Sequence, residues 1–128
     1  MVNNLVLTGR IASDFQIVTL ESGKKVTEIT IAVQRNFKNF EGKYEVDYFK
    51  ATLWDGLANT VGTYCVKGSM ISLVGRLQIR QTHIDERKIN IIEIIAENIG
   101  FLDKKTQPNK DASSVVTEET NETWYLTN

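Results

Sequence analysis

Residues 46–65 read VDYFKATLWDGLANTVGTYC, and two different periodicities meet in this stretch at Trp54. Before Trp54 the apolar residues occupy every second position: Phe49, Ala51 and Leu53. Beyond it they recur at the spacing of an amphipathic helix: Leu57, Ala58, Val61, Tyr64 and Cys65. The first pattern is typical of a strand buried on one face, and the second of a short helix packed on a core. The stretch therefore predicts a strand that runs directly into one helix, with Asp55 as N-cap and Gly68 just past its end.

The rest of the chain is rich in strand patterns. Strands are predicted over residues 5–10 (resuming at 16–20), 26–35, 46–55, 70–82 and 88–102. Three strands, one helix and two strands is the order of a five-stranded OB-fold barrel with its helix between strands 3 and 4. Gly9 and Gly75 lie inside strands, where glycine lets a barrel strand bend. We therefore expect an all-β fold with one short helix. The main alternative is a β-sandwich, which would not need that helix.

Length and composition predict one domain with a short tail. The chain has 128 residues, of which 41 % are apolar, enough to form a core. From residue 106 onward polar residues dominate, and such a segment buries too little apolar surface to offset its chain entropy. We expect an OB-fold domain at 1–105 and a flexible, mildly acidic tail at 106–128, broken near its end by Trp124-Tyr125-Leu126.

Charge alone does not identify a partner. Residues 1–105 hold 14 basic and 12 acidic residues, and residues 106–128 hold one basic and four acidic residues, so the net charges are +2 and −3. Attraction for a polyanion must therefore come from the placement of cations on one face.

The sequence offers no sign of a metal, a disulfide or a membrane span. Cys65 and His83 are its single cysteine and single histidine, too few for a zinc site, and a lone cysteine suits a reducing cytosol. We expect no metal and no cofactor. No stretch approaches the roughly 18 apolar residues of a transmembrane helix, and the N-terminus does not resemble a signal peptide.

Aromatic residues are concentrated in one region, because six of the eleven lie between Phe37 and Trp54. On the predicted strand over 46–55, Tyr48, Lys50 and Trp54 share the face opposite the core, so that a cation stands between two large rings. Rings can stack on any base while a lysine binds phosphate, which suits a single nucleic-acid strand. The alternative is that the two rings cover a second hydrophobic layer.

The neighbouring hairpin and the fourth strand add further candidates. Phe37 and Phe40 stand in a polar connection with little core to fill, among three cations: Arg35, Lys38 and Lys43. On the strand over 70–82 the apolar residues Ile71, Leu73, Leu77 and Ile79 are predicted to share the core face. The opposite face carries Arg76, Gln78 and Arg80. Lys67, Arg87 and Lys88 lie near turns, where a charge is usually only solvated, and of these Arg87 and Lys88 are the weaker candidates.

Catalytic patterns are missing from the sequence. It contains no phosphate-binding GxxxxGK[ST] loop and no histidine-based nucleophile pair, and its carboxylates form no dense cluster. We therefore expect no enzymatic activity.

Several short motifs, in order and spacing, resemble the bacterial and phage single-stranded DNA-binding proteins. The similarity runs from Asn3 to about Leu102 and is clearest in the following segments: Asn4-Leu5-Val6-Leu7-Thr8-Gly9-Arg10, Ile29-Thr30-Ile31-Ala32-Val33, Asp47-Tyr48-Phe49-Lys50, Leu53-Trp54 with Leu57-Ala58, Lys67-Gly68-Ser69, and Val74-Gly75-Arg76-Leu77. The resemblance implies an OB-fold protomer that assembles, usually as a homotetramer. It also implies binding of single-stranded DNA in replication, recombination and repair, in the bacterial cytoplasm as a nucleoid-associated or phage-encoded protein.

The resemblance also implies particular site residues. The stacking positions of that family fall on Phe37, Tyr48 and Trp54, and a fourth falls on Thr82, which is not aromatic here. The expected phosphate or base contacts are Arg10, Arg35, Lys38, Lys50, Lys67, Arg76 and Arg80, and the weaker candidates are Phe40, Lys43, Arg87 and Lys88. The chain ends in Trp124-Tyr125-Leu126-Thr127-Asn128 and lacks the acidic Pro-Phe tip with which relatives recruit replication and repair proteins, so tail docking is unsupported.

Two other functions remain open from the sequence. One is an OB-fold adaptor of a primosome or of RNA, which competition between DNA and RNA would distinguish. The other is a structural protein whose aromatic face is a subunit interface, in which case oligonucleotides would leave the fluorescence of Trp54 unchanged.

Overall fold

The structure is a computed structural model that describes residues 1–102, so the predicted tail at 106–128 lies outside the described residues. Six strands and one helix follow each other along the chain: β1 (Leu5–Ile11), β2 (Val18–Thr19), β3 (Lys25–Lys38), β4 (Tyr44–Trp54), α1 (Asp55–Tyr64), β5 (Met70–Ile84) and β6 (Arg87–Phe101). The predicted order is confirmed, but the strand expected at 16–20 shrinks to the two residues of β2.

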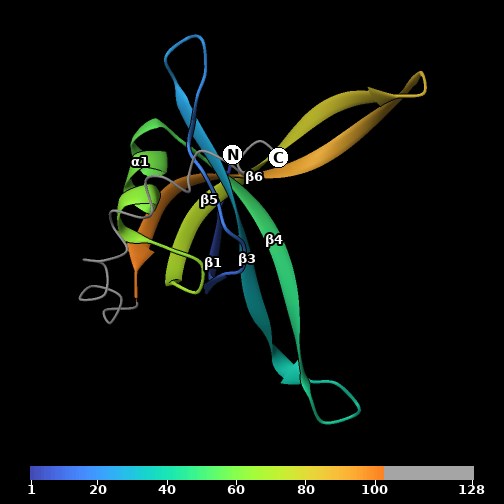
Figure 1. Cartoon of the computed structure of the whole chain (residues 1–128). Helices are drawn as coiled ribbons and strands as arrows, with labels where there is room; N and C mark the ends of the chain where they lie inside the picture. Colours follow the sequence, from blue (N-terminus) through green and yellow to red (C-terminus); the bar gives the residue numbers. More distant parts are fainter. Residues whose placement is uncertain (103–128) are drawn as a thin grey trace.

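The strands form a closed barrel, as Figure 1 shows. Their order is β1-β5-β6-β4-β3-β2, and β1 also pairs with β3, which closes the five long strands on themselves. All pairs are antiparallel except β4 with β6. The helix connects the third and fourth strands of the barrel, so the predicted OB-fold is confirmed and the β-sandwich is excluded.

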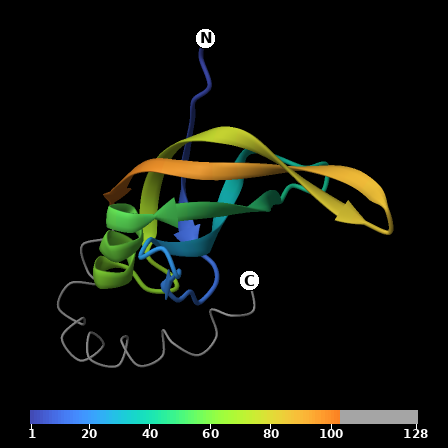
Figure 2. The ribbon, with the colours of Figure 1, turned by 90° about the horizontal axis from the view of Figure 1, so that it is seen from above.

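The core fills the barrel and extends beneath the helix. Inward-facing side chains of β3, β4 and β5 are fully buried: Ile29, Ile31, Ala51, Leu53, Ile71 and Leu73. From α1, Ala58 and Val61 close one end of the barrel, and Cys65 follows them into the core with only 3 % of its surface exposed. In Figure 2 the helix lies at the end of the barrel that is farthest from the β5–β6 hairpin.

The start of the helix differs from the prediction. Trp54, in an extended conformation, is the N-cap residue and makes no side-chain cap hydrogen bond. Asp55 is already the first helical residue, with a positive φ of 45°. Its carboxylate accepts a hydrogen bond from the backbone N–H of Lys25 at 3.1 Å instead. The prediction of Asp55 as N-cap is therefore wrong, because this carboxylate ties the helix start to β3.

The two glycines predicted to bend strands lie where backbones approach closely. A Cβ atom at Gly9 would overlap the carbonyl oxygen of Ala32 on β3. A Cβ atom at Gly75 would lie 2.5 Å from the carbonyl oxygen of Ile95, and the β5–β6 register shifts between Val74 and Gly75. Only glycine fits these two crossing points without displacing the neighbouring strand.

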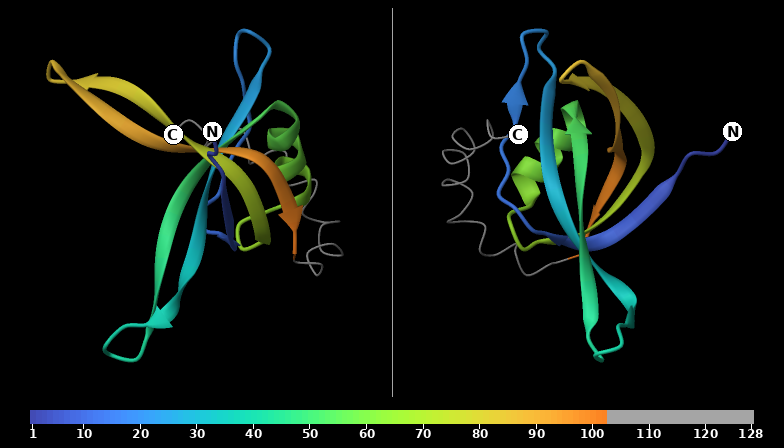
Figure 3. Two further views of the ribbon diagram at one scale, coloured as in Figure 1. Left: turned by 180° about the vertical axis from the view of Figure 1, so that it is seen from behind. Right: turned by 90° about the vertical axis from the view of Figure 1, so that its right-hand side faces the viewer.

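Two hairpins extend well beyond the barrel in different directions (Figure 3). We call residues 34–48 the β3–β4 arm and residues 76–93 the β5–β6 arm. The register of β3 with β4 shifts between Gln34 and Lys38, at the base of the first arm, and that of β5 with β6 shifts next to Gly75, at the base of the second. Such irregularities increase the twist of a hairpin and redirect it.

The β5–β6 arm corrects one prediction about the core. Leu77 and Ile79 share the face of Ile71 and Leu73 by alternation, but they are 45 % and 54 % exposed. After Gly75 the strand has left the barrel, so its apolar face has no facing sheet to cover it.

Candidate nucleic-acid interface

The outer face of β4 carries the predicted stacking residues. Ala51 and Leu53 are buried and Phe49 is half-buried, which confirms the predicted alternation. On the other face Tyr48 is 65 % exposed and Trp54 is 37 % exposed, with the exposed Lys50 between them. Both rings are thus accessible within the protomer, and neither belongs to a buried second layer.

Small side chains on β3 keep this face open. Tyr48 pairs with Ala32 and Lys50 with Thr30, so no bulky neighbour on that strand covers the ring or the cation. Ala32 in turn pairs with Arg10 of β1, which places Arg10, Ala32 and Tyr48 in one row across three strands. A shallow pocket of about 450 Å³ borders this row, and its lining includes Arg10, Gln34 and Val46.

Arg10 is held by a polar contact. Its Nη1 atom donates a hydrogen bond of 2.9 Å to the carbonyl oxygen of Gly68, in the loop between α1 and β5. Lys67 precedes Gly68 and is exposed, so the hydrogen bond to Gly68 ties Arg10 to the loop that carries Lys67.

The β3–β4 arm presents aromatic residues to solvent. Phe37 is 65 % exposed, and Phe40 at the tip is 99 % exposed. Lys38 and Lys43 lie on the same arm, as predicted. Sequence analysis missed Tyr44, which begins β4 and has the Nζ atom of Lys38 at 5.8 Å from its ring centroid. The signal that could have found it is the two-residue alternation from Tyr48 back through Val46.

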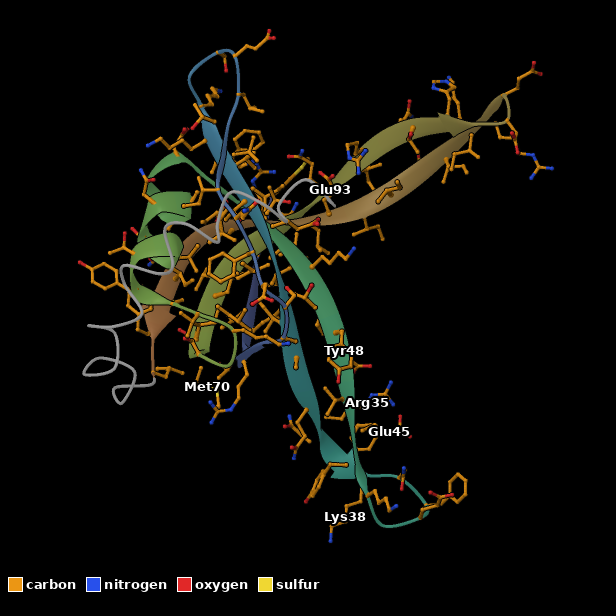
Figure 4. The ribbon with its side chains drawn as sticks, in the orientation of Figure 1. Arg35, Lys38, Glu45, Tyr48, Met70 and Glu93 are labelled. Atoms are coloured by element: carbon orange, nitrogen blue, oxygen red, sulfur yellow. The ribbon has the colours of Figure 1, made fainter. Side chains whose placement is uncertain are left out.

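Arg35 on this arm is bound to carboxylates. Its guanidinium donates hydrogen bonds of 2.9 and 3.0 Å to the two carboxylate oxygens of Asp47 and one of 2.9 Å to Glu45. Figure 4 labels Arg35 and Glu45 on this arm. The hydrogen bond from Arg35 lowers the pKa of Asp47, and the hydrogen bond to Asp47 raises the pKa of Arg35. Because consecutive strand residues face opposite ways, Asp47 and its partner Arg35 lie across the strand from Tyr48. Arg35 therefore lies on the opposite side of the hairpin from Tyr48, and not beside the exposed rings of β4 as expected.

The two arginines of β5 are also paired with acids. Arg80 forms a close ion pair with Glu93 of β6. Arg76 lies 3.4 Å from Glu97 and donates a 2.6 Å hydrogen bond to Gln78. The sequence predicted these cations on one face but not their acidic partners. A phosphate that binds here has to share each guanidinium with a carboxylate.

Two pockets lie where β4 meets β6 and the β5–β6 arm. A polar one of about 300 Å³ is lined by charged side chains that include Glu28, Lys50, Arg80 and Glu93. An apolar one of about 410 Å³ opens at the end of the barrel away from the helix, and its lining includes Leu5, Leu7, Tyr48, Leu77 and Ile92. Lys50 lines both pockets, so the same cation is within reach of a ligand in the polar pocket and of one in the apolar pocket.

The remaining candidates lie toward the end of the β5–β6 arm. Thr82 is half-buried and pairs with Ile89, while Arg87 and Lys88 are exposed at the start of β6. Arg87 and Lys88 are distant in sequence from the exposed rings of β4, and neither lines any of the three pockets described above.

Within residues 1–102, no three side chains among histidine, cysteine, aspartate and glutamate gather as a metal site would require. In the same part of the chain, no helix has the length and apolar character needed to cross a membrane.

A closed five-stranded barrel with an open face of rings and cations defines an OB-fold of the kind that receives a nucleic-acid strand. Within that class, residues 2–102 match the sequence profile described as the Single-strand binding protein family. The chain belongs to this family.

Similar proteins agree with this assignment. The chain is 36 % identical over 106 residues to "Single-stranded DNA-binding protein B" of Bacillus subtilis, covering 82 % of this chain and 94 % of that protein. It is 31 % identical to the "Single-stranded DNA-binding protein" of Enterococcus faecalis, covering 98 % of this chain and 67 % of that protein. Among solved structures, a Plasmodium falciparum SSB in complex with ssDNA superposes with a TM-score of 0.71 at 26 % identity, over 80 % of this chain and 96 % of that one.

Proposed function

We propose that this chain binds and protects single-stranded DNA, with little sequence preference, during replication, recombination and repair. Tyr48 and Trp54 stack on bases while Lys50 between them binds phosphate. Phe37 on the β3–β4 arm adds a third stacking position. The observation that supports this proposal most is the exposure of both β4 rings beside a cation. Membership of the single-strand binding family supports the same ligand.

Further cations extend the phosphate contacts. Arg10 and Lys67 contribute from the loop between α1 and β5, to which Arg10 is hydrogen-bonded. Lys38 contributes from the β3–β4 arm. Arg35, Arg76 and Arg80 contribute after they exchange carboxylates for phosphates. The weaker candidates Phe40, Lys43, Arg87 and Lys88 act only where a longer strand reaches the ends of the arms.

We also propose that the protein assembles as a homotetramer and acts in the bacterial cytoplasm. We propose no catalytic role for it. Support for assembly comes from β1, which pairs with β5 over residues 5–10 but with β3 only at Arg10 and Ile11. Val6, the second residue of β1, is 62 % exposed, as expected for a strand that another subunit covers. The bacterial sources of the similar proteins support the location.

Tryptophan fluorescence tests the proposed ligand. In a Trp124→Phe background, oligo-dT should quench Trp54, and raising the salt concentration should weaken binding with a slope of about −0.7 per phosphate contacted. Trp54→Ala and Phe37→Ala should each weaken binding by about 1–3 kcal/mol, whereas Trp54→Phe should retain most of the affinity because a ring remains.

Two results would count against the proposal. Unchanged Trp54 emission together with a flat salt response would exclude stacking on this face. RNA oligomers that bind more tightly than DNA of the same length would favour an RNA adaptor instead.

A further inference from the structure

The two arms differ in the residues available for stacking. The β5–β6 arm, residues 76–93, contains no phenylalanine, tyrosine or tryptophan, and Thr82 stands where the family resemblance implies a ring. The β3–β4 arm carries four rings: Phe37, Phe40, Tyr44 and Tyr48. A strand that leaves the β4 face therefore finds phenylalanine or tyrosine rings along only one of the two arms, and the other arm offers a single imidazole, that of His83.

Tyr44 lies on the same face of β4 as the proposed stacking residues. The register pairs Ala32 with Tyr48, Gln34 with Val46 and Lys38 with Tyr44. The extra residues at the shift between Gln34 and Lys38 lie on β3, so β4 itself continues to alternate and Tyr44 faces the same way as Tyr48. Tyr44 is 47 % exposed, more than Trp54 at 37 %. At about 3.3 Å per residue, Tyr44 lies roughly 13 Å beyond Tyr48 and roughly 33 Å from Trp54 along the strand.

A cation accompanies this ring, as Lys50 accompanies Tyr48 and Trp54. The Nζ atom of Lys38 lies 5.8 Å from the centroid of the Tyr44 ring, and Figure 4 shows Lys38 near the outer end of the arm. A ring for the base and an ammonium for the phosphate are the two elements of a single-strand contact. The pair of Lys38 and Tyr44 repeats that combination away from the barrel.

We infer that Tyr44 and Lys38 form a further nucleotide-binding position, so that base stacking continues from Trp54 along β4 onto the β3–β4 arm, whereas the β5–β6 arm offers phosphate contacts only. This inference rests on the proposed function. It assigns a stacking role to Tyr44 and explains how the protein can stack additional bases although residue 82 is not aromatic.

The pair could also serve the hairpin alone, since cross-strand neighbours stabilise a two-stranded ribbon. Three variants separate the two roles. Tyr44→Leu keeps apolar contact with Lys38 but removes the ring, and Tyr44→Trp keeps a ring. Tyr64→Leu is the matched control, because Tyr64 is a similarly exposed tyrosine at the end of α1, where it packs against Phe101 with ring centroids 5.5 Å apart.

The first measurement is the anisotropy of a labelled oligo-dT of about 20 nucleotides, longer than the range covered by one OB-fold. Tyr44→Leu should weaken binding about fivefold or more and reduce the number of nucleotides occluded per protomer, whereas Tyr64→Leu and Tyr44→Trp should bind as the wild type does. The thermal unfolding of each variant is recorded alongside, so that a loss of folding is recognised.

The second measurement reports contact directly. Tyr44→Trp combined with Trp54→Phe and Trp124→Phe leaves one indole, at residue 44, and oligo-dT should quench it. The inference is overturned if this emission stays constant while anisotropy records binding, or if folded Tyr44→Leu matches the wild type in both affinity and site size. Failure of the wild type to bind the labelled oligomer would instead refute the proposed function itself.

Discussion

The two arms are built alike but present different chemistry. Each is a long antiparallel hairpin that leaves the barrel at a register shift, next to Gln34 in one case and Gly75 in the other. The β3–β4 arm exposes rings beside lysines, whereas the β5–β6 arm exposes isoleucines, and its Arg76 and Arg80 are already paired with glutamates. Similar backbone geometry therefore does not imply a similar share in binding.

The difference shows which property of an arm decides its role. Both arms have cations, so charge alone would give them equal parts in binding a phosphate chain. Stacking requires a ring, and the intramolecular carboxylates of Glu93 and Glu97 compete with phosphate for Arg80 and Arg76. Because Arg35 on the β3–β4 arm is also paired with carboxylates, the rings are what make this arm the better nucleic-acid surface.

The sharpest test of this contrast removes one side chain from each arm. Tyr48→Ala should weaken binding of oligo-dT by about 1–3 kcal/mol, because a stacking ring is lost. Ile79→Ala removes an aliphatic side chain that is also more than half exposed, and it should change binding by less than about 0.5 kcal/mol. Isothermal titration calorimetry compares the two, and equal losses would remove the distinction between the arms.

A gain of function on the weaker arm should follow from Thr82→Trp. Thr82 is half-buried opposite Ile89 and two residues from Arg80, so an indole there would stand beside a cation. Affinity for long oligo-dT should rise by about 1 kcal/mol, with little change for oligomers too short to reach the arm. If the added ring brings no gain at any length, the strand does not approach this arm at all.

Releasing an arginine should have a smaller effect. Glu93→Gln frees the guanidinium of Arg80 from its ion pair, so phosphate no longer competes with a carboxylate. We expect a rise in affinity of about two- to fivefold and a salt slope that is steeper by about 0.7. Titrations at several salt concentrations measure both quantities, and an unchanged slope would show that Arg80 makes no phosphate contact.

The smallest effect should be the acid sensitivity of the β3–β4 arm. The pKa of Asp47 is lowered by its hydrogen bond from Arg35, so the folded pKa lies below the unfolded value of about 3.9. The stabilisation is complete above about pH 4 and is lost as the pH falls through the folded pKa. NMR titration of the Asp47 carboxyl should show the depressed pKa, and Arg35→Gln should return it toward 3.9. The pair is exposed, so unfolding temperatures should barely differ at neutral pH.

Regular strands inside the barrel could be predicted from the sequence because burial there follows a period of two. Ala51 and Leu53 were predicted to be inside and Tyr48 and Trp54 outside, and the structure agrees. The same period failed for Leu77 and Ile79. Alternation tells which residues share a face, but not where a strand leaves the core that would cover that face.

Features that depend on the pairing of distant strands could not be predicted. The ion pairs of Arg35 and Arg80 arise from cross-strand register, which no local pattern specifies. Asp55 has the right residue type and position for an N-cap, but its carboxylate bonds the N–H of Lys25, thirty residues earlier in the chain. Tyr44 was missed because the strand was predicted to begin at Val46.

The burial of Cys65 has a practical consequence for measuring the arms. A thiol enclosed in the core beneath α1 is inert toward labelling reagents under native conditions. Cysteines introduced at Asn39, in the connection of the β3–β4 arm, and at Glu86, in the turn of the β5–β6 arm, would thus be the groups that react with a maleimide dye or a spin label. The distance between two such probes would record how the hairpins move when a ligand arrives, with the natural cysteine left in place.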